Sequence, residues 1–135
     1  EEVAREEGIA SHVRTGPWRP HREALAFMAD ATMLVTMSGS NMAAIPAKTF
    51  ECVRFPAWIL ALSAPDSATD LLLRGTDADV AAPSDAERIA EIIEKRYREH
   101  AAGVRPEPVG RDVRFSRAHQ AALLFSALES RVAVS

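Results

Sequence analysis

The sequence predicts an α/β fold, specifically a Rossmann-like three-layer domain with a parallel sheet flanked by helices. Short apolar runs typical of buried strands occupy residues 32–37, 57–62 and, more weakly, 79–82. A segment with helical periodicity follows each run, and this alternation is typical of parallel sheets with right-handed helical crossovers. The chain has 135 residues, of which 47% are hydrophobic, which suffices for one core. We therefore expect a single domain over residues 1–135.

The amino-terminal part is expected to hold two helices joined by an extended segment and a turn. Residues 1–7 resemble the last turns of a helix. A short extended segment at residues 12–14 leads into Thr15-Gly16-Pro17-Trp18, which is a turn sequence. Pro20 then suits the first turn of a helix, because a proline there loses no helical hydrogen bond. We expect that helix to end near Asp30.

The first strand and the helix after it surround a loop of small polar residues. Residues 32–37 are almost continuously apolar, as expected of a strand that is covered on both faces. Ser38-Gly39-Ser40-Asn41 ends this strand. Residues 46–54 then have the pattern of a helix that directs Phe50 and Val53 inward.

The next segments continue the alternation. A helix is expected over residues 67–74, and Gly75 suits its end. Ser84 and Glu87 have the spacing of a capping box, which predicts the start of a longer helix reaching to about His100. One face of that helix carries the larger apolar side chains, namely Ile89, Ile92, Ile93 and Tyr97.

The carboxy-terminal part is expected to be a loop followed by one helix. Residues 101–112 contain two glycines and two prolines, which indicates a loop. The final helix starts near Ser116 and has an apolar stripe formed by Ala118, Ala121, Ala122, Phe125, Leu128 and Val132. We expect this stripe to be partly exposed, so that two copies of the chain could form a homodimer through it.

Composition excludes several classes of function. The net charge of −3 gives no basic excess for nonspecific nucleic-acid binding. Cys52 is the only cysteine, so no intrachain disulfide can form and a buried thiol in a reducing, cytoplasmic location is expected. The longest apolar runs are far shorter than the roughly 18–20 residues that cross a bilayer. His12 and His21 have no partners at metal-ligand spacing, so we expect neither a metal site nor a cofactor.

Three loops are candidates for a binding site, because ligands of open parallel sheets bind at the carboxyl ends of the strands. These loops cover residues 15–18, 38–47 and 63–67. The backbone of the second loop is small enough to approach a phosphate group. Neither it nor the third loop matches a Walker or GxGxxG sequence, so an ordinary polar turn remains an alternative interpretation of each.

Lys48 and Glu51 are the most unusual candidates. They lie at positions i and i+3 of the helix that follows the polar loop. A carboxylate at this place could accept hydrogen bonds from both hydroxyls of a ribose, and the lysine could bind an anion. A solvent-exposed ion pair between the two is the alternative.

The chain also resembles the carboxy-terminal half of family 4-type GT-B glycosyltransferases. The likeness starts at Ala29-Asp30-Ala31 before the first strand. It is most specific at Ile45-Pro46-Ala47-Lys48-Thr49-Phe50-Glu51-Cys52 and continues through Phe55-Pro56 and Ala82-Pro83-Ser84-Asp85-Ala86-Glu87 to Phe115-Ser116. It therefore covers essentially the whole chain. The resemblance implies a domain that binds a nucleotide diphosphate sugar, the donor of a transferred sugar.

The resemblance also assigns roles to residues. Glu51 matches the glutamate that holds the ribose hydroxyls, and the Gly16-Pro17-Trp18 turn matches the lining of the base pocket. The segment near the diphosphate and sugar contains Ser40, Asn41, Ile45, Pro46 and Lys48. By fold analogy, Ser63, Asp66 and Ser67 close the pocket. No catalytic residue is assigned.

Two features depart from the family. Many members that retain the anomeric configuration have a second glutamate eight positions before the ribose glutamate, and Ala43 stands there in this chain. The family's diphosphate-binding arginine and lysine, and its acceptor-binding half, would precede residue 1. The resemblance thus implies a piece of a longer two-domain enzyme that binds the donor weakly and transfers no sugar alone, with the amino-terminal half as its partner.

Two other functions remain open. A GT-B-fold nucleotide-sugar epimerase would share the ribose glutamate, but acid and base residues for it are not evident in the sequence. A non-catalytic flavodoxin-like interaction module would need an acidic cluster at the strand ends, whereas serine, glycine and asparagine follow the strand at residues 32–37. A peripheral membrane contact of the parent enzyme also remains open.

Overall fold

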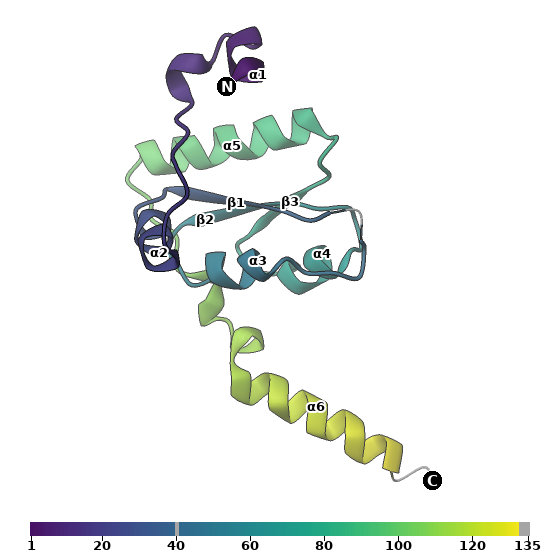
Figure 1. The fold of residues 1–135 in the computed structure, drawn as a ribbon. Coiled ribbons are helices and arrows are strands. Elements are labelled where there is room, and N and C mark those ends of the chain that lie inside the picture. Colours follow the sequence, from purple (N-terminus) through teal and green to yellow (C-terminus); the bar gives the residue numbers. More distant parts are fainter. Residues whose placement is uncertain (40, 133–135) are drawn as a thin grey trace.

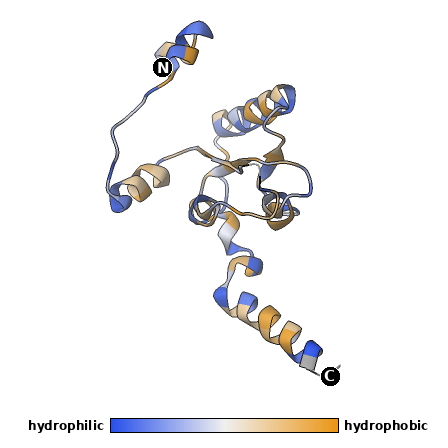
Figure 2. Cartoon of the chain, turned by 45° about the vertical axis from the view of Figure 1, so that its right-hand side comes forward, coloured by the Kyte–Doolittle hydropathy of each residue, from blue (hydrophilic) through white to orange (hydrophobic). Residues whose placement is uncertain are grey.

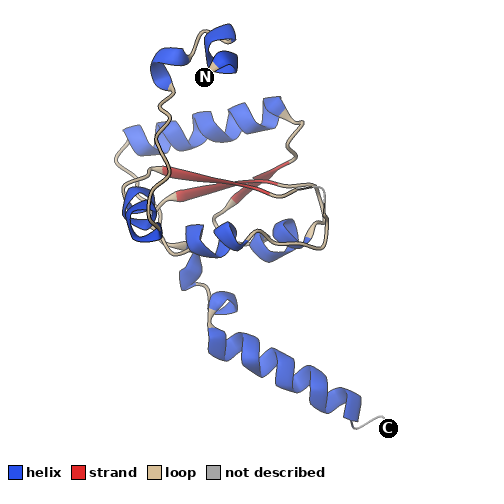
Figure 3. Ribbon diagram, in the orientation of Figure 1, coloured by secondary structure: helices blue, strands red, loops and turns tan. Residues whose placement is uncertain are grey.

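The computed structural model describes residues 1–39 and 41–132 and contains helices and a small parallel sheet (Figures 1 and 3). In chain order, the elements are α1 (Glu2–Glu6), η1 (Ala10–His12), α2 (His21–Ala29), β1 (Met33–Met37), α3 (Ala47–Cys52), β2 (Trp58–Leu62), α4 (Ala68–Leu73), β3 (Asp79–Ala81), α5 (Ala86–Ala101), η2 (Val109–Arg111), η3 (Val113–Phe115) and α6 (Arg117–Val132). The mixture of helices and a parallel sheet confirms the expected α/β class.

The sheet has three parallel strands in the order β1-β2-β3. Met33 pairs with Trp58 at the start of the β1–β2 ladder, and Leu60 pairs with Asp79 at the start of the β2–β3 ladder. Helix α5 lies on one side of the sheet, and α3 and α4 lie on the other (Figure 1). The central strand β2 is therefore buried on both faces, and Ile59, Leu60 and Ala61 have almost no exposed surface.

Local signals account for most helix boundaries. Pro20 and Pro46 are the N-cap residues of α2 and α3, as their fixed φ angles favour. Ser67 caps α4 by accepting a hydrogen bond from the Asp70 amide. The predicted capping box at Ser84 was wrong by one residue, because the Asp85 carboxylate accepts from the Arg88 amide at 3.0 Å and caps α5 instead.

Strand β1 corrects the expectation of a strand covered on both faces. It is one of the two edge strands of the sheet, with β2 on one side only. Leu34 and Thr36 are buried, but Val35 and Met37 are 55% and 65% exposed. One further inward prediction was wrong, because Phe50 of α3 is exposed. An apolar run by itself cannot tell a central strand from an edge strand.

The chain ends extend away from the sheet (Figures 1 and 2). The predicted extended segment at residues 12–14 is not a strand, because η1 occupies Ala10–His12 and only Val13 onward is extended. The predicted loop at residues 101–112 includes the end of α5 and the short helix η2. Helix α6 projects from the body, with Phe125 and Leu128 mostly exposed. Among the described residues, no helix has the length and apolar character to cross a membrane.

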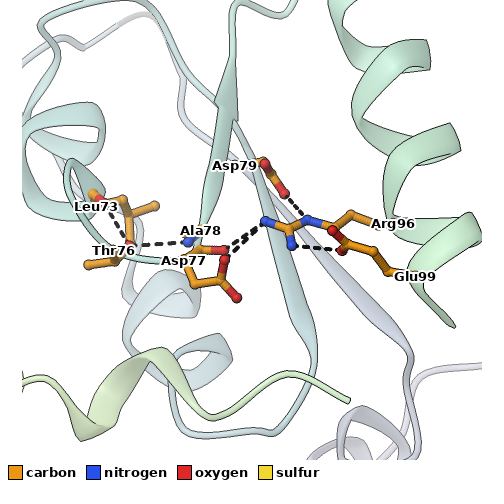
Figure 4. A network of polar contacts seen from close by, with 7 residues as sticks. All are labelled: Leu73, Thr76, Asp77, Ala78, Asp79, Arg96 and Glu99. Atoms are coloured by element: carbon orange, nitrogen blue, oxygen red, sulfur yellow. Dashed lines mark hydrogen bonds and ion pairs between the residues drawn. The ribbon is translucent and has the colours of Figure 1, made fainter. Parts of the chain in front are cut away.

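Arg96 fixes α5 to the edge of the sheet at β3 (Figure 4). Its guanidinium donates to Asp79 at 2.7 Å, to Glu99 at 2.9 Å and to the Asp77 carbonyl and carboxylate at 3.2 Å. It also lies 5.9 Å from the ring centre of Trp58. Burial disfavours the charge, but the hydrogen bonds with Asp79 and Glu99 outweigh burial and raise the pKa of Arg96. Arg96 is therefore a buried cation held by several carboxylates.

Candidate functional site

A cavity of about 780 Å³ lies between the segment after η1, helix α2, strand β1 and helix α3. It is lined by Arg14, Thr15, Gly16, Pro17, Arg19, Ala24, Phe27, Met28, Leu34, Val35, Lys48 and Cys52. Its size is in the range of pockets that hold small molecules, which is roughly 300–1,000 Å³. Three residues predicted for the site, Gly16, Pro17 and Lys48, are thus brought together although they are up to 32 positions apart in the sequence.

The charged residues of this cavity are all cations. Arg14, Arg19 and Lys48 line it, and none of its described lining residues is acidic. Phe27 and Met28 of α2 and Leu34 of β1 supply an apolar wall. The Arg19 guanidinium lies 5.9 Å from the centre of the Phe27 ring. An anionic ligand with a flat or apolar portion fits this combination.

Glu51 lies beside the cavity and is bonded to a residue that lines it. Lys48 Nζ donates to Glu51 Oε2 at 2.5 Å, and His21 Nε2 lies 2.9 Å from Glu51 Oε1. The Glu51 side chain is 27% exposed. The hydrogen bond from Lys48, followed by that with His21, lowers the pKa of Glu51 below its usual range. The carboxyl group is therefore ionised at neutral pH and can only accept hydrogen bonds.

The described residues of the predicted phosphate loop, 38–39 and 41–47, do not line this cavity. Ser40 lies outside the described residues. The Asn41 side chain accepts a hydrogen bond from the Ala43 amide at 3.0 Å, which stabilises a local turn. Ile45 is partly buried, and Pro46 starts α3 and so positions Lys48 and Glu51.

Ser63, Asp66 and Ser67, which were expected to close the pocket, lie between the end of β2 and the start of α4. Ser63 Oγ and Ser67 Oγ are 2.6 Å apart and both residues are buried. Asp66 accepts from Arg74 Nη2 at 2.7 Å and has a φ of 58°. These three residues do not line the cavity, and their polar groups have partners within their own segment.

Trp18 was expected in the base pocket with Gly16 and Pro17. Trp18 is 86% exposed, and it does not line the cavity. The tryptophan therefore covers neither the core nor the cavity.

Sequence reasoning missed three basic residues of the site, as well as its apolar wall. Arg14 and Arg19 line the cavity on both sides of the Gly16-Pro17 turn, and His21 bonds Glu51. Two arginines flanking a turn were a usable signal of an anion-binding wall. The contact between His21 and Glu51 had no sequence signal, because it joins positions 30 residues apart.

Cys52 and three paired aspartates have structural roles. Cys52 is buried, and burial is the main cause of its raised pKa, so the thiol is protonated at neutral pH. Asp70 pairs with Arg74, and Asp77 and Asp79 pair with Arg96. Over residues 1–39 and 41–132, no three His, Cys, Asp or Glu side chains are grouped as metal ligands.

Comparison with known proteins identifies no relative of this chain, since no family model, no curated protein sequence and no solved structure matches it.

Proposed function

We propose that this domain binds the nucleotide diphosphate portion of an activated sugar and forms the donor-binding half of a glycosyltransferase. The observation that carries the proposal is the cation-lined cavity, in which Lys48 joins Arg14 and Arg19 opposite an apolar wall. Helices on both sides of the parallel sheet fit a Rossmann-like arrangement. The cavity lies along β1, beside Leu34 and Val35.

The charges of the cavity fit a diphosphate. A nucleoside diphosphate has two or three negative charges, and arginine and lysine are the residues that bind phosphate oxygens best. Because Arg14 and Arg19 come from the segment between η1 and α2 and Lys48 comes from α3, a diphosphate would bridge two separate parts of the chain. The neighbouring apolar side chains Phe27 and Met28 would contact the base.

Glu51 would accept hydrogen bonds from the ribose hydroxyls. Its carboxylate is ionised and held by Lys48 and His21, and both partners are exposed on the surface of the molecule. The ribose hydroxyls would displace one of these partners and donate to the carboxylate oxygens. Lys48, freed from Glu51, would then be available to the diphosphate.

The transfer itself would need the second half of the enzyme. A cleft between two halves would hold the donor and the acceptor hydroxyl in contact, and the cations would stabilise the departing diphosphate as its charge develops. The acceptor oxygen would form its bond to the anomeric carbon while the bond from that carbon to the diphosphate breaks, and the hydroxyl proton would be released with the nucleoside diphosphate.

Titration with nucleoside diphosphates and their sugar conjugates tests the proposal. Amide resonances of ¹⁵N-labelled protein should shift around Gly16, Lys48 and Glu51 when the right nucleotide is added. Lys48→Ala should weaken binding roughly tenfold or more, since hydrogen bonds to charged groups are worth about 1.5–3 kcal/mol. Lys95→Ala, at an exposed position of α5, is the matched control and should change nothing. Shifts away from the cavity, or equal effects of the two variants, would contradict the proposal.

A further inference from the structure

A second cavity, of about 400 Å³, lies at the amino ends of β1 and β2. Thr32, directly before β1, and Trp58, the first residue of β2, line it together with the ends of α2 and α5. Figure 1 shows both helix ends on this side of the sheet. The cavity shares no described lining residue with the cation-lined cavity and is therefore a separate place. Its volume is near the lower limit of small-molecule pockets, roughly 300–1,000 Å³, which suits a small ligand.

Trp58 forms the floor of this cavity, since only 2% of the residue is exposed. The Arg96 guanidinium lies 5.9 Å from its ring centre, and the His100 ring meets it edge to face at 6.3 Å. Within residues 1–39 and 41–132, every fully enclosed polar side-chain atom has a partner, whereas the Trp58 indole N–H has none. The indole N–H is therefore not fully enclosed, and it reaches one of the two adjoining cavities that Trp58 lines. A fixed ring with an unused hydrogen-bond donor is typical of a binding surface.

Arg105 brings a positive charge to the cavity, and one edge of its guanidinium is unused. Arg105 Nη1 donates to His100 Nδ1 and to the Val104 carbonyl, both at 3.0 Å. These two bonds use both hydrogens of Nη1 and fix the guanidinium. The Nε–H and the two Nη2–H groups have no partner in the described part of the chain. They lie along one edge of the guanidinium, and such an edge matches the two oxygens of a carboxylate.

Asp30 brings the opposite charge to the same cavity. It is the C-cap residue of α2, where the helix dipole disfavours a carboxylate. Its carboxylate has no hydrogen bond or ion pair with any described residue, so no cation of the chain offsets this position. Asp30 and Arg105 thus line one cavity without pairing with each other. A ligand with an ammonium at one end and a carboxylate at the other would pair with both.

We propose that this cavity binds a small zwitterion, namely a free α-amino acid with an uncharged side chain. The ammonium group pairs with Asp30, and the carboxylate accepts two hydrogen bonds from the unused edge of Arg105. The side chain of the ligand lies against Trp58 and the two prolines of the lining, Pro56 and Pro106. Asp30 and Arg105 are the only acidic residue and the only arginine or lysine among the described lining residues. A further charge on the ligand would therefore lack a partner, so leucine should bind more tightly than lysine or glutamate.

Titration of the ¹⁵N-labelled chain with L-leucine tests this site through its tryptophans. Trp58 and Trp18 each give one indole N–H resonance, and the Trp18→Phe variant assigns them. Leucine should shift the Trp58 resonance with saturation and leave that of Trp18 unchanged, because Trp18 does not line the cavity. N-acetyl-leucine lacks the ammonium group and leucinamide lacks the carboxylate. Each should bind roughly tenfold or more weakly than leucine, because each loses a hydrogen-bonded ion pair.

Two variants assign the two ends of the ligand. Asp30→Asn should weaken the binding of leucine roughly tenfold or more without changing that of N-acetyl-leucine. Arg105→Gln should weaken the binding of leucine in the same way without changing that of leucinamide. Glu94→Gln and Arg98→Gln are the matched controls, because these residues pair with each other at the exposed surface of α5 and do not line the cavity. Both controls should bind leucine like the wild type, and circular dichroism verifies that each variant is folded.

Several results would overturn the proposal. An unchanged Trp58 resonance up to the solubility limit of leucine means that no such site exists. Equal binding of leucine and N-acetyl-leucine means that Asp30 holds no ammonium group, and equal binding of leucine and leucinamide excludes the carboxylate contact with Arg105. A shift of Trp58 caused by inorganic phosphate but not by leucine would show an anion site instead. Equal effects of the cavity variants and the control variants would also contradict the assignment.

Discussion

Arg96 should be the charged residue whose loss costs the fold most. Replacing it by alanine leaves the Asp79 carboxylate, whose side chain is only 12% exposed, without its partner at 2.7 Å. Breaking a buried pair from one side costs about 3–5 kcal/mol. Asp77 and Glu99 are more exposed and can be hydrated after the change, so we expect a value near the lower limit, about 3 kcal/mol.

This loss should be visible in thermal unfolding. For a chain of this length the entropy of unfolding implies a fall in Tm of about 10 °C for Arg96→Ala. Arg98→Ala is the matched control, because Arg98 lies on the same helix and pairs with Glu94 at the exposed surface. It should lower stability by less than about 1 kcal/mol. Equal stability of the two variants by calorimetry and urea unfolding would refute the role assigned to Arg96.

Three further variants or conditions have defined outcomes. Gly110→Ala should cost about 1–3 kcal/mol in urea unfolding, because the added Cβ would lie 2.8 Å from the Val53 carbonyl oxygen, whereas Gly39→Ala meets no atom within 4 Å and should be neutral. Cys52 should react with thiol reagents much more slowly in the native protein than in denaturant, because the thiol is buried and its pKa is raised; equal rates would show that it is accessible. Glu51→Gln should lower Tm at pH 7, and the difference should vanish as the pH falls through the lowered pKa of Glu51, since the stabilisation belongs to the ionised form; a difference that persists in acid would contradict this.

Local sequence signals predicted the order of the elements well. Pro20, Pro46 and Gly75 fix helix boundaries by their own backbone preferences, and the structure places helix ends next to them. The exposure of Val35 and Met37 could not be predicted, because it depends on how many strands lie beside β1 rather than on the β1 sequence. The same holds for Arg96, whose partners Asp79 on β3 and Asp77 just before β3 lie 17 and 19 positions away.

Only part of the candidate site could be predicted, because the rest depends on contacts between segments that are distant in the sequence. Lys48 and Glu51 are neighbours on one helix, so their pairing follows from helical spacing alone. Arg14 and Arg19 line the same cavity as Lys48 only because the segment between η1 and α2 lies near β1 and α3. The serines at residues 63 and 67 were assigned to the site by fold analogy, but the structure shows them bonded to each other at the start of α4.

The most direct test of the central claim compares a nucleoside diphosphate with its 2′-deoxy counterpart, on the wild-type chain and on Glu51→Ala. If Glu51 holds the ribose, removal of the hydroxyl should weaken binding to the wild type roughly tenfold or more and should make no further difference in the variant. An equal loss in both proteins, or no loss in the wild type, would show that Glu51 does not contact the ribose and would contradict the account.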